Sequence, residues 1–296
     1  MSRAILLQIL LVFGALGAHP AVSAPAHEYA EVSTARRTRP ALRPFLSFPS
    51  SHSSLLFVAA HPDDEVLLAP VLGWLCDHSG WSCTILIATR GERGECLLPQ
   101  GCLPTLADVR SAEAAEAARL FSAKVILWNL ADGPANAPDL VRHHWESQDQ
   151  NLTDRIAAFI EDEQPDVIFT FDPRHGSTCH PDHRAIGSLA MDAAASLSRD
   201  VFLLENRYSV SGNEVTITRA SVDPSRLVYF DASRSAPRAQ SSYWDYGPLI
   251  ATIYRSQFSP EIVQSLAETP RHLQWMFFEA GSSSSAFAGA GMCENE

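Results

Sequence analysis

Two short clusters of ionisable residues carry the side chains best suited to chemistry. The first reads Ala60-His61-Pro62-Asp63-Asp64-Glu65. The second, more than 100 positions later, reads Cys179-His180-Pro181-Asp182-His183-Arg184. Imidazole nitrogens and carboxylate oxygens together suit zinc, and a catalytic zinc site has three protein ligands with a water in the fourth position. The alternative for Asp63 or Asp64 alone is a cap on the helix that follows.

The clusters need elements that bring them together, and the chain alternates apolar runs with helical patterns. Four apolar runs are typical of buried strands: 54–60, 83–89, 124–130 and 166–172. Four helical patterns alternate with them: 65–78, 106–121, 151–163 and 181–197. This alternation predicts the α/β class, with a Rossmann-like, doubly wound, mostly parallel sheet in three layers. Each cluster follows a strand, so we expect the active site at the strand carboxyl ends.

The second half of the chain is less regular. Strand-like runs lie at 201–210, 214–218, 225–230 and 273–280, and one or two helices lie within 234–267. The residues after 280 are rich in Gly, Ser and Ala, which is typical of a loose segment. We therefore expect one domain over 53–280 and a flexible tail over 281–296.

The N-terminus has the layout of a secretory signal peptide. Arg3 supplies a positive start, residues 4–18 form an apolar run of 15, and small residues follow. That run is short for a membrane span, which needs about 20 residues. We expect a signal peptide over 1–24 with cleavage between 18 and 26, then an irregular lead-in over 25–52. The protein would be secreted or periplasmic, without a transmembrane segment after processing. The alternative is an uncleaved membrane anchor.

The chain has six cysteines: Cys76, Cys83, Cys96, Cys102, Cys179 and Cys293. An even number in an exported chain indicates disulfides, and the short spacings make Cys76–Cys83 and Cys96–Cys102 natural local pairs. Sequence alone leaves the connectivity open, and free buried thiols are the alternative. The sequon Asn151-Leu152-Thr153 matters only in a eukaryotic secretory pathway.

With both clusters in view, the chain resembles the LmbE-like or PIG-L-type zinc de-N-acetylase family. The resemblance rests on AHPDDE at 60–65 paired with HPDH at 180–183, and it extends loosely from about residue 54 to about residue 267. The pairing is much more specific than either motif alone. Supporting matches are Thr89-Arg90-Gly91-Glu92, Arg110-x-x-Glu113, Asp132-Gly133 and Tyr254-Arg255-Ser256-Gln257.

The resemblance implies a set of site residues. The implied ligands of one zinc ion per chain are His61, Asp64 and His183. The implied catalytic residues are Asp63 as general base and His180 as the second reacting group, positioned by Asp182. Arg110 and Asp132 match positions that usually line the sugar site.

The implied reaction is removal of an N-acyl group, expected to be acetyl, from an amino sugar or a GlcNAc-containing conjugate. Zinc lowers the pKa of water and polarises the amide oxygen. Asp63 would take the proton of the water, and protonated His180 would stabilise the oxyanion and protonate the leaving amine. Glu65 is expected mainly to place negative charge in the first turn of a helix, with a supporting role in the site as the lesser possibility.

Three features of this sequence bear on the sugar site. Some family members carry a Tyr two residues before the first His of the second motif, where it helps the oxyanion. Here that position is Thr178, and Tyr208 or Tyr254 is a candidate substitute. The long loop 93–106 is expected to lie beside the mouth of the site. Trp145 and Trp244, which lie in polar contexts, are candidates for stacking on a sugar face.

Charge and residue content also weigh against other functions. The formal net charge is −12, whereas nucleic-acid binding needs a basic face, so nucleic acid is excluded as the expected partner. A metal-dependent phosphoesterase is the alternative enzyme, but it usually needs more carboxylate ligands and a basic phosphate pocket. A secreted carbohydrate-binding module without turnover is the third possibility. The presence of Asp63 and His180 argues against it, because a binding module needs neither. The oligomeric state stays open.

Overall fold

The computed structural model describes residues 43–44, 53–205, 208–211, 214–217, 227–236, 242–269, 274–281 and 293. The expected signal peptide over 1–24 lies outside the described residues, as do most of the lead-in over 25–52 and most of the tail over 281–296. Within the described ranges no helix combines the length and the apolar character that a membrane crossing requires.

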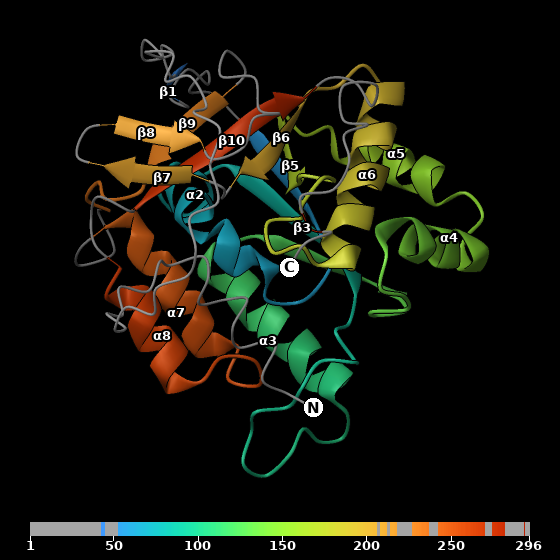
Figure 1. Ribbon diagram of the computed structural model, residues 1–296, viewed down its shortest axis with the longest axis horizontal. Coiled ribbons are helices and arrows are strands. Elements are labelled where there is room, and N and C mark those ends of the chain that lie inside the picture. The colour runs from blue at the N-terminus through green and yellow to red at the C-terminus, as the bar shows by residue number, and fades with distance from the viewer. Residues whose placement is uncertain are drawn as a thin grey trace, which may run out of the picture.

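A mostly parallel sheet of eight strands runs through the molecule (Figure 1). Its strands are β1 (Arg43–Pro44), β2 (Ser54–Ala59), β3 (Ser82–Thr89), β4 (Lys124–Leu130), β5 (Val167–Phe171), β6 (Val201–Glu205), β9 (Leu227–Asp231) and β10 (Trp275–Gly281). Their order across the sheet is β1-β9-β10-β6-β5-β2-β3-β4. Strand β10 is antiparallel to β6 and β9, and the other pairs are parallel. A separate antiparallel pair consists of β7 (Tyr208–Ser211) and β8 (Glu214–Ile217).

The strand order places a switch point beside β2. The chain moves from β2 outward through β3 and β4, and then returns to the other side of β2 with β5 and β6. The connections after β2 and after β5 therefore leave the sheet in opposite directions. Doubly wound folds bind ligands at this switch point, at the carboxyl ends of the strands. The predicted fold class is confirmed.

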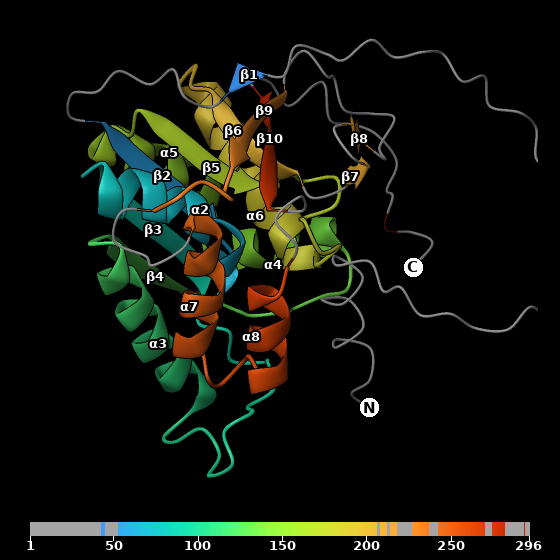
Figure 2. The same ribbon diagram turned by 90° about the vertical axis from the view of Figure 1, so that its left-hand side faces the viewer.

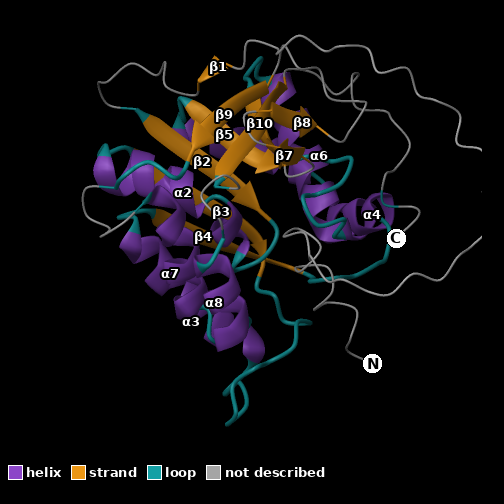
Figure 3. Cartoon of the chain, turned by 60° about the vertical axis from the view of Figure 1, so that its left-hand side comes forward, coloured by secondary structure: helices purple, strands orange, loops and turns teal. Residues whose placement is uncertain are grey.

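Helices cover both faces of the sheet (Figures 2 and 3). The helical elements on one side are the 3-10 turn Asp64–Leu67, α2 (Ala69–Leu72), the π turn Gly73–His78, α3 (Leu106–Leu120), the 3-10 turn Tyr243–Asp245, α7 (Tyr246–Ile253) and α8 (Pro260–Ala267). Those on the other side are α4 (Pro138–Gln148), α5 (Leu152–Glu163) and α6 (Pro181–Ser196). Helix layers on both faces explain why the central strands read as continuous apolar runs.

The core lies along β2 and its neighbours. Residues Leu56 to Ala59 of β2 are 0% exposed, and Phe169 and Phe171 of β5 are equally buried. Each Val, Leu, Ile or Phe side chain buried in this way contributes about 1.5–3 kcal/mol to the free energy of unfolding. The first cluster, at 60–65, therefore follows a deeply buried strand, which gives it a rigid base.

Two predicted elements differ from the structure. The helix expected over 65–78 is a succession of short 3-10, α and π turns. Pro70 is one reason, because it lacks the N–H that would continue the hydrogen-bond ladder through this segment. Helix α4 was not predicted at all, since among its residues only Val141 and Trp145 are buried and its apolar pattern is correspondingly weak.

All six cysteines are paired. The two local pairs are confirmed, with Cα atoms 5.8 Å apart in Cys76–Cys83 and 6.0 Å apart in Cys96–Cys102. The third bridge, Cys179–Cys293, joins residues 114 positions apart. It attaches the C-terminal region to the residue directly before His180. The alternative of free buried thiols is therefore wrong.

Candidate active site

The two clusters meet at the switch point. Strands β2 and β5 pair directly, with Phe57 opposite Phe169. The first cluster leaves β2 at its carboxyl end, and the second begins α6 after the turn that follows β5. Because these parallel strands end on the same edge of the sheet, side chains 122 positions apart, His61 and His183, come within 3.2 Å.

Three donor atoms form a triangle there. Nδ1 of His61 lies 3.2 Å from Nε2 of His183, which in turn lies 3.0 Å from Oδ1 of Asp64. The third edge, from Nδ1 of His61 to Oδ1 of Asp64, is 3.8 Å. A tetrahedral zinc ion with ligands at its usual bond lengths places neighbouring donor atoms about 3.3 Å apart. The three residues that the sequence indicated as ligands therefore fit a zinc ion in both chemistry and spacing.

Hydrogen bonds with the surrounding chain orient two of these donors. Oδ2 of Asp64 accepts from the backbone N–H groups of Ala60 at 2.8 Å and His61 at 2.9 Å, so Oδ1 is the oxygen directed at the triangle. Nδ1 of His183 donates to the carbonyl of Gly176 at 2.8 Å, and Oγ1 of Thr178 lies 3.1 Å away. That bond selects the tautomer in which Nε2 carries a lone pair, as a metal ligand requires.

Two further carboxylates face the other nitrogen of His61. Nε2 lies 3.1 Å from Oδ1 of Asp132 and 3.2 Å from Oδ2 of Asp182. Oδ2 of Asp182 also accepts from the N–H of Gly133 at 2.8 Å. An Nε2–H shared by the two acids leaves Nδ1 free for a metal ion, which is the usual outer support of a histidine ligand.

Asp132 and Asp182 thus occupy positions that differ from the sequence-based expectation. Asp182 was expected to position His180, but its carboxylate hydrogen-bonds His61 and Gly133, and it meets His180 only through its own backbone N–H. Asp132 was expected to line a sugar site, yet it is 5% exposed and directed at His61. Only the packing of β4 and α6 around β2 reveals this arrangement.

The charges of this group are interdependent. Burial lowers the pKa of His61, but its hydrogen bonds with Asp132, Asp182 and Asp64 raise that pKa well above the ordinary value. Burial raises the pKa of Asp132, but the hydrogen bond and charge of His61 bring it down to about 2. Likewise, burial raises the pKa of Asp64, and the two histidines then hold it well below its usual range. The carboxylates favour positive charge here, which a proton or a metal ion can supply.

Asp63 has the properties of a general base beside the triangle. Its side chain is 20% exposed, whereas the ligand side chains of His61, Asp64 and His183 are 9% exposed or less. Burial raises the pKa of Asp63 to about 6, against the lowering effect of Arg110. A carboxylate with a pKa near the working pH suits proton transfer. Its backbone lies at φ 110°, a conformation that L-residues rarely adopt.

Arg110 holds this carboxylate. Its Nη2 lies 2.8 Å from Oδ2 of Asp63 and also donates to the carbonyl of Pro62, and its Nη1 donates to the carbonyl of Gly91 at 3.1 Å. A Cβ on Gly91 would lie 2.2 Å from that Nη1, so any other residue there would displace the Arg110 guanidinium. Arg110 was expected to line the sugar site, but the structure places it, 4% exposed, behind Asp63.

His180 is half-buried, and its ring centroid lies 4.7 Å from that of His61 and 5.0 Å from that of His183. It is the N-cap of α6, where its Nδ1 accepts from the backbone N–H of Asp182 at 3.2 Å. The neutral ring therefore carries its proton on Nε2. Burial, together with the charges of His61 and His183, lowers the pKa of His180 to about 3. The group available to a substrate is thus a neutral N–H donor, in place of the protonated imidazole that the sequence suggested.

Of the two candidate substitutes for a tyrosine at Thr178, Tyr254 does not reach this position. Tyr254 is 0% exposed, and its hydroxyl donates to Glu65 beneath the site. The side chain of Tyr208 lies outside the described residues. Thr178 itself contacts Nδ1 of His183, one of the three residues of the donor triangle.

The expected sugar-stacking role of Trp145 is wrong. Its side chain is 0% exposed and its Nε1 donates to the carbonyl of Ala131 at 2.7 Å. Trp244 is half-buried, with its Nε1 bonded to the carbonyl of Leu266 at 3.0 Å. Polar neighbours in the sequence therefore did not identify an exposed tryptophan. Both indole rings can be buried because each indole N–H donates to a backbone carbonyl.

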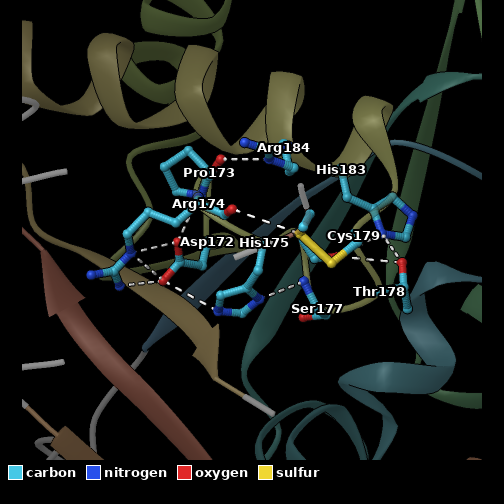
Figure 4. The surroundings of a disulfide bond; sticks show 11 residues. Asp172, Pro173, Arg174, His175, Ser177, Thr178, Cys179, His183 and Arg184 are labelled. Atoms are coloured by element: carbon cyan, nitrogen blue, oxygen red, sulfur yellow. Dashed lines mark hydrogen bonds and ion pairs between the residues drawn. A yellow bond between two sulfur atoms is a disulfide. The ribbon is translucent and has the colours of Figure 1, made fainter. Parts of the chain in front are cut away.

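The turn that carries the second cluster has its own support, which the sequence analysis missed (Figure 4). Nε of Arg174 lies 2.8 Å from Oδ1 of Asp172, and Nη2 of Arg174 lies 2.5 Å from Oε2 of Glu279 on β10. The disulfide Cys179–Cys293 closes the same turn one residue before His180. No local pattern links Arg174 with Glu279, since they are 105 positions apart.

The loop expected beside the mouth is anchored at its base to the site. The backbone N–H of Arg93 donates to Oδ2 of Asp132 at 2.7 Å, and Oε1 of Glu92 accepts from the N–H of Asp132 at 2.9 Å. Beyond this base the loop between β3 and α3 projects from the body of the molecule (Figure 2). In the sequence, Glu92 was only one residue of the motif Thr89-Arg90-Gly91-Glu92. Its hydrogen bond with Asp132 gives this residue a structural role at the site.

The chain is similar to known proteins in sequence. Residues 56–194 match the family model described as PIG-L: GlcNAc-PI de-N-acetylase. A 1D-myo-inositol 2-acetamido-2-deoxy-alpha-D-glucopyranoside deacetylase from Catenulispora acidiphila is 28% identical over 174 residues, which cover 53% of this chain and 53% of the relative. The chain therefore spans about half the length of the curated relatives it matches.

Solved structures share the architecture. An N,N'-diacetylchitobiose deacetylase from Pyrococcus horikoshii aligns with a TM-score of 0.51 at 18% identity, covering 78% of this chain and 85% of that one. The 4-carboxy-2-hydroxymuconate hydratase GalB from Pseudomonas putida aligns with a TM-score of 0.52 at 15% identity, covering 77% and 95%. At such identities the likeness shows the fold alone. Because the two names describe different reactions, the activity has to be argued from the site.

Proposed function

We propose that this chain is a zinc-dependent N-deacetylase of amino sugars and a member of the PIG-L family, whose model its residues 56–194 match. One zinc ion per chain would be held by His61, Asp64 and His183. The observation that carries the proposal is the donor triangle, with edges of 3.0 to 3.8 Å, beside a partly exposed Asp63. A ligand set with a neighbouring base is what amide hydrolysis at an open metal site needs.

The chain's own residues supply the proton transfers. Zinc in this site supplies a Lewis acid that polarises the amide oxygen and lowers the pKa of water. Asp63, held at Oδ2 by Arg110, takes the proton of the attacking water. His180 donates a hydrogen bond from Nε2 to the developing oxyanion, since its Nδ1 is occupied by the helix N–H. Protonated Asp63 then returns the proton to the leaving nitrogen, because a free amine anion is a poor leaving group.

The proposed substrates are N-acetylglucosamine conjugates. The relative from Catenulispora acidiphila is named for an acetamido sugar linked to inositol, and the Pyrococcus horikoshii enzyme is named for diacetylchitobiose. Both names describe an acetamido group on a sugar ring. The chemistry available at the donor triangle, Asp63 and His180 acts on that acetamido group, whichever aglycone the sugar carries.

We further propose that the protein is exported. Three disulfides persist only in an oxidising compartment, and the N-terminal apolar run precedes the domain. A secretory signal peptide accounts for both features. Fractionation of expressing cells, with N-terminal sequencing of the mature protein, tests this. A mature chain that still begins at Met1 and stays with the membrane would support the anchored alternative.

The decisive experiment uses the folded, disulfide-bonded protein. Metal content is measured by mass spectrometry, and acetate release from a panel of N-acetylglucosamine conjugates is compared for the wild type, Asp63→Asn and Asp154→Asn. Asp154 is an exposed acid in the first turn of α5 and serves as the matched control. We expect one zinc in all three proteins and loss of acetate release by about 10²–10⁴-fold in Asp63→Asn alone.

Each other outcome points to a different function. Two metals per chain with phosphoester hydrolysis would support a phosphoesterase. Sugar binding without turnover would support a binding module. A chain that binds no metal would show that the assignment of His61, Asp64 and His183 is wrong.

A further inference from the structure

The main chain at Asp63 needs support, because its φ of 110° is outside the regions that a residue with a side chain favours. Such a conformation persists only when surrounding contacts hold it. The catalytic carboxylate projects from this residue, so the angle at the main chain sets where the carboxylate lies. Whatever holds this backbone therefore affects the proposed reaction.

We propose that Tyr254 is a positioning residue that holds Asp63 through Glu65. The hydroxyl of Tyr254 donates to Oε1 of Glu65, and Oε2 of the same carboxylate accepts from the backbone N–H of Asp63 at 3.1 Å. Tyr254 and Glu65 are each 0% exposed, so no bulk water competes for these bonds. The inference rests on the proposed role of Asp63 as general base.

Tyr254 is itself firmly placed. It is the C-cap of α7, where its N–H bonds to the carbonyl of Ile250 at 3.3 Å. The N–H groups of Gln257 and Phe258 both bond to its carbonyl at 2.9 Å. The residue therefore belongs to a hydrogen-bonded turn between α7 and α8, and it transmits the position of that turn to Glu65.

The same turn supports Asp63 from a second direction. Ser256 donates from its N–H to Oε1 of Glu113 at 3.0 Å and from its hydroxyl to Oε2 at 2.5 Å. Glu113 lies on α3, one turn after Arg110, which holds the carboxylate of Asp63. The turn between α7 and α8 is thus linked to Asp63 in two ways. Tyr254 is linked to the Asp63 backbone through Glu65, and Ser256 is linked to the Asp63 carboxylate through Glu113 and Arg110 of α3.

A direct role for Tyr254 in the reaction does not fit its surroundings. It lies under the Asp63 main chain, and its hydroxyl proton is committed to Glu65. The substrate side of the site is formed by the partly exposed Asp63 and His180. The role that fits Tyr254 is therefore support of the base, in place of the oxyanion role for which it was a candidate.

The test compares two phenylalanine variants in the full chain. Tyr254→Phe removes the hydroxyl that binds Glu65. Tyr246→Phe is the matched control, because Tyr246 is also buried and lies in the same helix. Its hydroxyl donates to the carboxylate of Asp77 at a distance of 2.5 Å, and Asp77 lies outside the chain of hydrogen bonds that joins Tyr254 to Asp63. We expect Tyr254→Phe to lower kcat at least tenfold with KM changed less than twofold. Tyr246→Phe should leave both within twofold of the wild type.

Amide hydrogen exchange gives a measurement that does not depend on activity. The peptide covering residues 61–66 should exchange faster in Tyr254→Phe than in the wild type, and at the wild-type rate in Tyr246→Phe. Unchanged exchange in Tyr254→Phe would overturn the positioning role, whether or not a substrate has been found. A wild type that binds zinc but hydrolyses no acetamide would count against the proposed function, and the exchange result would still decide the positioning of Asp63.

A double variant tests whether Tyr254 acts through Asp63. In an Asp63→Ala background, Tyr254→Phe should change the residual rate by less than twofold, because the carboxylate that it positions is gone. A further tenfold loss in that background would show that Tyr254 acts on the reaction by another route, and the proposal would be wrong.

Discussion

Oδ2 of Asp182 lies 3.2 Å from Nε2 of His61, although the two residues are 121 positions apart in the sequence. If His61 binds zinc as proposed, Asp182 supports that ligand, and this leads to the first prediction. Asp182→Asn should weaken zinc binding by about 10–100-fold, the usual cost of losing such a partner. Competition with a zinc chelator measures this affinity.

The control for that experiment is Asp192→Asn in the same helix. The carboxylate of Asp192 accepts a hydrogen bond from Arg142 at a distance of 2.5 Å, outside the donor triangle. It should leave the zinc affinity unchanged. If Asp182→Asn instead lowers kcat and keeps wild-type affinity for zinc, the residue serves His180, as the motif alone suggested.

A second prediction concerns Gly91. A Cβ there would lie 2.2 Å from Arg110, whereas nothing lies within 4 Å of a Cβ on Gly101, and the two residues have similar φ of 65° and 76°. Gly101→Ala therefore measures backbone strain alone. Gly91→Ala should add about 1–3 kcal/mol of destabilisation through overpacking, and it should lower kcat by displacing Arg110 from Asp63. Urea unfolding and steady-state kinetics of both variants test this, and equal effects would contradict it.

The third prediction addresses the ion pairs of Arg174. Its side chain is 7% exposed and contacts Asp172 and Glu279, which are 1% and 3% exposed. Arg174→Met would leave two buried carboxylates without this cation, so we expect a loss of about 3–5 kcal/mol in the free energy of unfolding. Arg142→Met is the control, because Arg142 also binds two carboxylates but is 27% exposed, and its loss should cost at most about 1 kcal/mol. Similar losses of unfolding free energy in the two variants would show that the buried ion pairs of Arg174 contribute no more to stability than the partly exposed ion pairs of Arg142.

The fourth prediction compares two disulfides. Cys179–Cys293 spans 114 residues and Cys96–Cys102 spans 6. Chain entropy predicts stabilisation of about 4.8 kcal/mol for the first and about 2.2 kcal/mol for the second. Replacing each pair by two serines and measuring urea unfolding should show the larger loss for Cys179–Cys293. The reverse order would mean that the C-terminal region is held in place without its bridge.

The elements of the fold were predictable to different degrees. Strands β2, β3, β4 and β5 and helices α3, α5 and α6 have strong periodic or apolar patterns, and the sequence placed each of them within a few residues. Helix α4 was missed because most of its residues face solvent. The segment 65–78 was expected to be one helix because its apolar residues have helical spacing. Pro70 lacks the N–H needed for a continuous ladder of backbone hydrogen bonds, and the spacing of apolar residues carries no information about that ladder.

Apolar periodicity and motif spacing are local properties of the chain, so they were enough to predict the α/β class and two ionisable clusters after buried strands. The family resemblance then named the proposed zinc ligands. The packing of the layers was needed to show which nitrogen of His61 faces Asp132 and Asp182, that Arg110 contacts the Asp63 carboxylate, and that Tyr254 reaches Asp63 through Glu65. These contacts join residues from different strands and helices. Their partners are selected by how the layers pack around β2, and no pattern in one segment records that packing.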